Sequence, residues 1–219
     1  MDAPGTIRDL IREAALRDPG APAFIAPGRA AMTYGQLDEV VAKLIGSLSS
    51  LGFPEGGRLA AALPNGPEMA VAFLAAACAG ACAPLNPAYS VEEFEFYLRD
   101  LRASALLTSD GASQSAVVAA ARLGLPVLTI ETRPSSPAGE FAITGAGRSA
   151  RASAPEVHSS GVALLLHTSG TTSRPKLVPL THSNLCASAE AIQRTLALTP
   201  ADCCLNMMPL FHIHALAAC

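Results

Sequence analysis

The sequence predicts an α/β fold built around a largely parallel sheet. Short, continuously apolar segments recur along the chain, which is typical of strands buried on both faces. Each of these segments alternates with one that has helical periodicity or a helix-capping signal. With 219 residues, half of them apolar and 15% charged, the chain is long enough and apolar enough to bury a substantial core.

The first elements are predicted from capping and turn signals. Thr6 is placed to cap a helix whose apolar residues fall on one face. Two short strands around a Pro-Gly turn are then expected at residues 23–26 and 31–34. Thr33 and Gln36 have the spacing of a capping box, so they predict the start of a second helix, which Gly52 ends.

Regular alternation of strands and helices is predicted for the middle of the chain. The expected strands are 58–63, 81–85, 104–108 and 126–130, and the expected helices are 68–79, 90–101 and 113–123. Ser90 and Glu93 supply the capping box of the second of these helices. The segment before each helix is continuously apolar, which indicates α/β units around a largely parallel sheet.

A change of composition divides the chain into two predicted lobes. Residues 133–155 are rich in Pro, Ser, Gly and Ala, so they predict a flexible connection, with a short strand possible at 141–144. Residues 1–132 then form an N-terminal α/β lobe, and 156–219 begin a second lobe. That lobe starts with an apolar strand at 162–166 and continues with a helix at about 183–198.

Charge and composition exclude several classes of partner. The net charge is -3 and Trp is absent, so the chain lacks both the basic surplus and the aromatic platforms that nucleic acids need. Its N-terminal segment has no apolar stretch of the kind found in secretory signals. The most apolar stretch, 68–85, is short for a membrane span and contains Gly80 and Pro84. We therefore expect a cytoplasmic protein without a membrane span.

The six cysteines do not follow the spacing of a zinc module. Cys203 and Cys204 lie near His212 and His214, so a metal cluster is one reading of this segment. Adjacent cysteines in an apolar run are more often small buried hydrophobic residues, and we favour that reading. The sequence thus predicts reduced, structural thiols and assigns no metal ligand.

A loop rich in hydroxyl groups follows the apolar strand at 162–166. The nine residues Thr168 to Lys176 contain five hydroxyl side chains, one glycine and two cations. Hydroxyls and backbone N–H groups satisfy phosphate oxygens, Gly170 allows close approach of the backbone, and Lys176 and Arg174 offset negative charge. These features favour a polyphosphate ligand.

Two other readings of this loop are weaker. A solvated Ser/Thr turn after a strand fits the composition alone. A P-loop is disfavoured, because the second glycine is missing before Lys176, Leu177 replaces the required hydroxyl, and Pro179 prevents an immediate helix.

These residues resemble the phosphate-binding signature of the adenylate-forming superfamily, which includes acyl-CoA synthetases. The match runs from His167 to Thr181 around a Thr-Ser-Gly-Thr-Thr core followed by Pro-Lys. Three further segments are similar to elements of that family. They are Thr33-Tyr34-Gly35-Gln36-Leu37, Asn86-Pro87 and Met208-Pro209-Leu210-Phe211-His212-Ile213-His214. The resemblance covers essentially the whole chain and implies the N-terminal part of that family's large domain.

The resemblance also implies an activity and a set of site residues. ATP, with Mg²⁺, would activate a carboxylic acid as its acyl adenylate, and coenzyme A would then take the acyl group. The cofactor-binding residues would be Thr168, Ser169, Gly170, Thr171, Thr172 and Lys176. Lys176 would also assist pyrophosphate release, and His212 would line the acid site, so these two are the predicted catalytic residues.

Two positions depart from the usual pattern. Ser173, with Arg174 after it, makes the signature similar to that of the oxalate–CoA ligase branch, whereas Leu177 replaces the glycine that normally follows the lysine. The oxalate-like variant and the His-x-His ending at His212 and His214 favour oxalate or another short acid as the substrate. The resemblance to acyl-CoA synthetases also implies a place in fatty acid metabolism.

The resemblance implies an incomplete enzyme, because the adenine, metal and ribose ligands and the mobile C-terminal domain of the family come later in its sequence. We therefore expect this chain to be an N-terminal fragment that is inactive by itself and that associates through faces exposed by truncation. A shortened, non-catalytic binding module and a phosphotransferase that uses the loop differently are the competing hypotheses.

Overall fold

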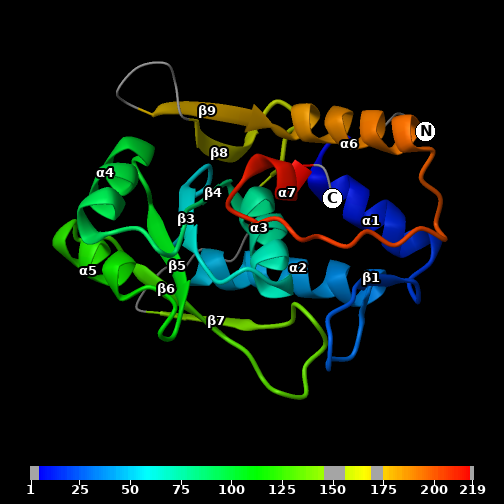
Figure 1. The fold of residues 1–219 in the computed structure, drawn as a ribbon, viewed down its shortest axis with the longest axis horizontal. Helices are drawn as coiled ribbons and strands as arrows, with labels where there is room; N and C mark the ends of the chain where they lie inside the picture. The colour runs from blue at the N-terminus through cyan, green and yellow to red at the C-terminus, as the bar shows by residue number, and fades with distance from the viewer. Residues whose placement is uncertain (1–4, 146–155, 169–174, 218–219) are drawn as a thin grey trace.

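The computed structural model describes residues 5–145, 156–168 and 175–217, which Figure 1 shows as a layered α/β structure. A seven-stranded sheet has the order β7-β6-β5-β3-β4-β8-β9. The five central strands pair in parallel, and only the outermost strands, β7 and β9, are antiparallel to their neighbours. The predicted α/β fold with a largely parallel sheet is confirmed.

The elements follow one another in the predicted rhythm. The strands of the large sheet are β3 (Arg58–Ala62), β4 (Ala81–Pro84), β5 (Ala105–Ser109), β6 (Val127–Glu131), β7 (Ala142–Gly145), β8 (Val162–Thr168) and β9 (Lys176–Thr181). A separate antiparallel pair consists of β1 (Pro22–Phe24) and β2 (Met32–Thr33). The helices are α1 (Ile7–Arg17), α2 (Tyr34–Ser50), α3 (Pro67–Ala79), α4 (Val91–Leu101), α5 (Gln114–Arg122), α6 (His182–Leu196) and α7 (Ile213–Ala217).

Helices cover both faces of the sheet because its central strands are apolar on both sides. Along β3, Leu59 and Ala61 join the core under α1, α2 and α3, whereas Ala60 and Ala62 join the core under α4 and α5. Successive side chains of a strand point to opposite faces, so a continuous apolar run supplies two cores at once. Figure 1 shows α4 and α5 on one side of the strands and α1, α2 and α3 on the other.

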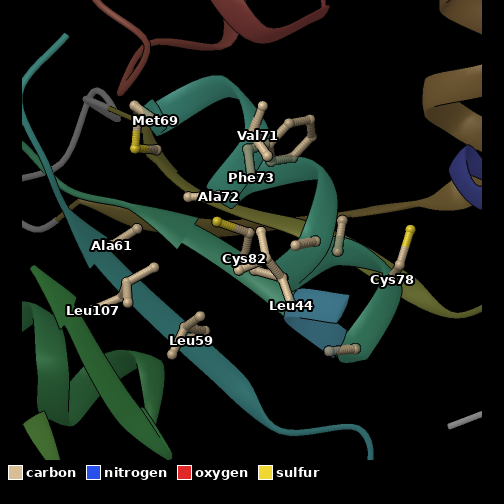
Figure 2. Packing of buried hydrophobic residues seen from close by; sticks show 14 of the residues in the cluster. Leu44, Leu59, Ala61, Met69, Val71, Ala72, Phe73, Cys78, Cys82 and Leu107 are labelled. Atoms are coloured by element: carbon tan, nitrogen blue, oxygen red, sulfur yellow. The ribbon is translucent and has the colours of Figure 1, made fainter. Parts of the chain in front are cut away.

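Helix α3 packs against the sheet through small side chains. Nine of its thirteen residues are buried, and most of these are alanines. Figure 2 shows Ala72, Phe73 and Cys78 of this helix in the same cluster as Leu44 and Cys82. Immediately after α3, Gly80 lies against the backbone carbonyl of Gly57, at a distance that leaves no room for a Cβ atom. Small residues therefore set the distance between this helix and the sheet.

Capping residues fix the helix starts where the sequence predicted them. The Thr33 hydroxyl accepts a hydrogen bond from the Gln36 backbone N–H, and Oε1 of Gln36 accepts one from the Thr33 backbone N–H, which completes a capping box. The same reciprocal pair forms between Ser90 and Glu93 at α4. Thr6 caps α1 as predicted.

Three elements near the end of the chain differ from the sequence prediction. The edge strand β9 was not predicted, since Pro179 argues against a strand; an edge strand tolerates proline because one side of it needs no partner. Helix α6 begins at His182, one residue early, because Thr181 and Asn184 form a capping box. The short helix α7 carried no sequence signal.

The predicted connection between lobes contains structured residues. Ala138 and Phe141 are buried, and residues 142–145 form β7, close to the strand considered possible at 141–144. Strand β8 pairs with β4, so described residues on both sides of the connection belong to one sheet. The division of the chain into domains stays a prediction.

The cysteines that the structure describes are all free, but they differ in burial. Cys78, Cys82 and Cys186 are free and buried, as predicted. The expectation that Cys203 and Cys204 are buried was wrong: both are free and exposed, because their segment runs over the surface. Within the described ranges, no helix has the length and apolarity needed to cross a membrane.

Candidate phosphate-binding site

A β-hairpin closed by β8 and β9 carries the predicted phosphate loop. Its last paired residues, Thr168 and Lys176, lie opposite each other and are both exposed. The hairpin therefore brings a hydroxyl and an ammonium group to the two ends of the loop. The predicted ligands Ser169, Gly170, Thr171 and Thr172, and the cation Arg174, lie outside the described residues.

The buried part of β8 fixes the direction in which the loop leaves the sheet. Leu164, Leu165 and Leu166 are all buried, and β8 pairs in parallel with β4 through Cys82 and Leu164. The loop thus leaves from the carboxyl edge of the parallel strands, on the same side as the segments that follow β3 and β4. In open α/β sheets this edge is where ligands bind.

His167, near the end of β8, contacts helix α4. Nε2 of His167 lies 2.8 Å from Oδ2 of Asp100 on α4, and its side chain is almost fully buried. The His167 ring meets the Tyr97 ring edge-on at a centroid distance of 4.7 Å, and Tyr97 stacks on Tyr89 at 4.9 Å. Burial and a hydrogen bond with Tyr97 raise the pKa of Tyr89 to about 12. His167 therefore connects the end of β8 to α4 through Asp100 and Tyr97.

Sequence reasoning did not find Asp100 or Tyr97. Asp100 and His167 are 67 residues apart in sequence, and no local pattern marks a contact between a helix and a strand at that separation. What the sequence did offer was the amphipathic pattern of α4, which predicts the buried residues Phe94 and Leu98 but not the partner of a polar one.

The second predicted catalytic residue, His212, lies in an exposed turn. The His212 backbone N–H donates to the Pro209 carbonyl at 3.0 Å, and its ring lies 4.5 Å from the Phe211 ring. His214 is also exposed. Thr168 and Lys176 belong to the hairpin of β8 and β9, whereas His212 precedes α7, and no hydrogen bond joins His212 to either of them among the described residues.

The turn before His212 docks on the carboxyl edge of the sheet. The Leu210 side chain is buried, and its backbone N–H donates to Oδ1 of Asn65 at 2.9 Å. A cavity of about 20 Å³ beside it is lined by Leu63, Asn65, Met69, Leu85, Pro87, Leu210 and Phe211. This volume holds about one water molecule, so the crevice is filled by the chain itself.

The remaining histidine of this region is structural. His182, at the start of α6, is buried, and its Nδ1 accepts a hydrogen bond from the Ile7 backbone N–H at 3.2 Å. Burial lowers the pKa of His182, against an opposing hydrogen bond with the Ala77 backbone. His182 therefore stays neutral and ties α6 to α1 and α3.

A sequence profile supplies the decisive comparison. The profile of AMP-binding enzymes matches residues 11–219. The chain belongs to the AMP-binding enzyme family. The likeness to adenylate-forming enzymes that the phosphate loop indicated is thus confirmed over nearly the whole chain.

Two curated relatives of this chain are named as CoA ligases. A probable CoA ligase of Humulus lupulus, CCL9, is 36% identical over 97% of this chain and 41% of its own length. An oxalate–CoA ligase of Arabidopsis thaliana is 37% identical over 97% of this chain and 42% of its own length. The chain thus spans about two fifths of the length of these relatives.

Solved structures share the fold. ATP-bound MatB of Rhodopseudomonas palustris superimposes with a TM-score of 0.80 at 24% identity, over 98% of this chain and 42% of that one. An Archaeoglobus fulgidus long-chain-fatty-acid–CoA ligase, FadD1, superimposes with a TM-score of 0.78 at 24% identity, over 99% of this chain and 45% of that one. At these identities the likeness concerns the fold alone.

The described site residues suit phosphate better than a metal ion. Thr168 can donate a hydrogen bond through its hydroxyl and Lys176 three through its ammonium group, and both reach solvent. Across the part of the chain that the structure describes, no three His, Cys, Asp or Glu side chains cluster as metal ligands would. The role of Thr168 and Lys176 in binding phosphate stays a prediction.

Proposed function

We propose that the polypeptide carrying this chain is an acid–thiol ligase that uses ATP to activate a carboxylic acid and then transfers the acyl group to coenzyme A. The single observation that carries the proposal is the hairpin at the carboxyl edge of the sheet, where Thr168 and Lys176 flank the hydroxyl-rich loop. Membership of the AMP-binding family and the CoA-ligase names of its relatives support the same reaction class.

The reaction has two balanced steps. A carboxylate oxygen attacks the α-phosphorus of ATP, the bond to the β-phosphate oxygen breaks, and pyrophosphate leaves. The sulfur of coenzyme A then attacks the acyl carbonyl carbon, its thiol proton is released, and AMP leaves with the bonding electron pair. Both steps depend mainly on positioning and on the stabilisation of phosphate charge. Mg²⁺ would arrive with the nucleotide.

Residues of this chain would bind the phosphate groups of ATP. Lys176 would place a positive charge beside the β- and γ-phosphates and stabilise the departing pyrophosphate. Thr168 and the loop residues Ser169, Gly170, Thr171 and Thr172 would supply the remaining hydrogen bonds to phosphate oxygens. His212 would face the carboxylic acid from the neighbouring exposed turn.

The chain offers a matched control for Lys176. Its sequence contains two lysines, and the other, Lys43, is exposed on α2. We expect Lys176→Ala to weaken pyrophosphate binding by about 10- to 100-fold, because a hydrogen bond to a charged group contributes roughly 1.5–3 kcal/mol. Lys43→Ala should bind like the wild type. Equal affinities of the two variants, measured by calorimetric titration with pyrophosphate, would rule out the assigned role.

Isotope exchange between ATP and pyrophosphate tests the reaction itself. In the whole polypeptide that carries this sequence, exchange should depend on an added carboxylic acid. A phosphotransferase would show no such dependence. Binding of pyrophosphate without exchange, for every acid supplied, would instead favour a non-catalytic binding module.

We propose oxalate or another short acid as the substrate. The loop variant with Ser173 and Arg174 favours it, and the similarity to an oxalate–CoA ligase supports it. Exchange in the presence of oxalate should exceed that with a long-chain fatty acid; the reverse order would overturn this choice of acid.

A further inference from the structure

Asn65 lies in the turn between β3 and α3, and within the described residues its side chain makes no hydrogen bond to that turn. It follows β3 and precedes Gly66, the N-cap residue of α3, which makes no side-chain capping bond. Asparagine in such turns usually bonds the backbone two residues further on. Here Oδ1 of Asn65 instead accepts a hydrogen bond from the Leu210 backbone N–H, across 145 residues of sequence.

The position of Asn65 in the sheet gives this contact its significance. Strand β3 leads through α3 to β4 on one side of it, and β4 leads through α4 to β5 on the other side. The connections that leave the neighbouring strands β3 and β5 run in opposite directions, to β4 and β6, so the topological switch point of this sheet lies between β3 and β5. Asn65 follows β3, the first of these two strands. Leu210 packs between the segments that follow β3 and β4, and Oδ1 of Asn65 accepts the hydrogen bond from its backbone N–H.

The held backbone leads directly to His212. Pro209 and His212 are joined by a backbone hydrogen bond of 3.0 Å, so Leu210 lies inside the turn that presents the histidine. The segment before the turn is poorly buried, with Leu205 and Met207 each 81% exposed. Leu210 attaches the turn itself to the core, and Ala215 on α7 is the next residue along the chain that is buried there.

We propose that Asn65 is a positioning residue that fixes the turn at Pro209–His212 and thereby sets where His212 meets the carboxylic acid. The effect on catalysis rests on the proposed function, whereas the hydrogen bond between Leu210 and Asn65 is observed in this chain. Asn65 acts through the backbone of Leu210 and touches neither substrate nor phosphate.

Two substitutions distinguish the loss of the hydrogen-bond acceptor at position 65 from a change in side-chain size. Asn65→Leu keeps a similar volume and removes the acceptor, whereas Asn65→Asp keeps an oxygen that can accept from the Leu210 N–H. Asn206→Leu is the matched control, because Oδ1 of Asn206 accepts the local Met208 N–H within the same segment.

Nuclear magnetic resonance on the chain tests the positioning without activity. The Phe211 ring, 4.5 Å away, shifts the resonances of the His212 ring protons. In Asn65→Leu these shifts should move towards random-coil values, and hydrogen exchange of the Leu210 amide should accelerate about 2- to 10-fold, since a net hydrogen bond contributes roughly 0.5–1.5 kcal/mol. Asn65→Asp and the control should keep the wild-type spectrum. An unchanged His212 spectrum in Asn65→Leu overturns the inference.

Kinetics of the whole polypeptide then test its meaning for the reaction. Asn65→Leu should raise the KM for the carboxylic acid about tenfold and leave the KM for ATP unchanged, with recovery in Asn65→Asp. A general loss of structure would raise both constants together, and that result overturns the positioning role. If the wild-type protein shows no acid-dependent exchange between ATP and pyrophosphate, the proposed function is refuted instead. The His212 resonances still decide whether Asn65 positions the turn.

Discussion

The buried imidazole of His182 gives the most exacting test of the packing. The side chain is 2% exposed and lies where α6 meets the start of α1. Its Nδ1 is the acceptor for the Ile7 N–H, and it also bonds the Ala77 backbone. Replacing it perturbs two buried backbone groups on two different helices.

Substitution by leucine should cost about 2–4 kcal/mol of unfolding free energy. An unsatisfied buried N–H at Ile7 accounts for roughly 1–3 kcal/mol, and loss of the bond with Ala77 adds about 1 kcal/mol. Asparagine places an amide oxygen near the former position of Nδ1, so it retains an acceptor for Ile7. His182→Asn should therefore cost only about 1 kcal/mol.

The same site makes stability depend on pH in a predictable direction. Burial lowers the pKa of His182 in the folded protein below its ordinary value, so the unfolded chain binds the extra proton first. The stabilisation is fully present above an unfolded pKa of about 6.5 and is lost as the pH falls below it. Between pH 7.5 and 5.5 this single group removes at most about 1.4 kcal/mol.

Chemical denaturation at pH 7.5 and 5.5 measures both effects. The difference in unfolding free energy between the wild type and His182→Asn should narrow at the lower pH, because only the wild type carries this titrating group. Other histidines contribute equally to both proteins and cancel. If the wild type and the Asn variant lose the same free energy over this interval, the buried neutral imidazole is not the source of the pH dependence.

Two further predictions concern packing and thiol exposure. Gly80→Ala should lower the free energy of unfolding by about 1–3 kcal/mol, because its Cβ would overlap a backbone carbonyl. Gly46→Ala on α2, where the added Cβ meets no neighbouring atom, should raise the free energy of unfolding by about 0.5–1 kcal/mol. Thermal unfolding distinguishes the two variants, and equal shifts of their melting temperatures would contradict the close packing at Gly80. Alkylation followed by mass spectrometry should label exposed Cys203 and Cys204 well before Cys82, whose pKa is raised by burial; early labelling of Cys82 would contradict its buried position.

Local signals predicted most of the fold. The capping boxes at Thr33 and Ser90 formed because every group that they need lies within four residues of sequence. The buried strands were predictable because a doubly covered strand must be apolar throughout. Strand β9 was missed because Pro179 is tolerated only at an edge, and edges are defined by the whole sheet.

The candidate site was predictable in composition but not in contacts. The loop residues and His212 were found from residue types and resemblance, and their roles stay predictions. The partners Asp100 and Asn65 lie 67 and 145 residues from the atoms that they bind, so only the folded chain reveals them. Cys203 and Cys204 show the converse error: an apolar neighbourhood in sequence does not bury a segment that packs against little.

The sheet order has a consequence for synthesis of the chain. Strand β4 lies between β3 and β8, and its Cys82 pairs with Leu164, which the ribosome adds 82 residues later. At about 5–20 residues per second, β4 presents an open hydrogen-bonding edge for about 4–16 s. Ala81 and Ala83 make this edge a poor template for stray strands, because alanine is disfavoured in sheets. The small residues of β4 should thus lower the tendency of the nascent chain to pair with other strands before β8 is synthesised.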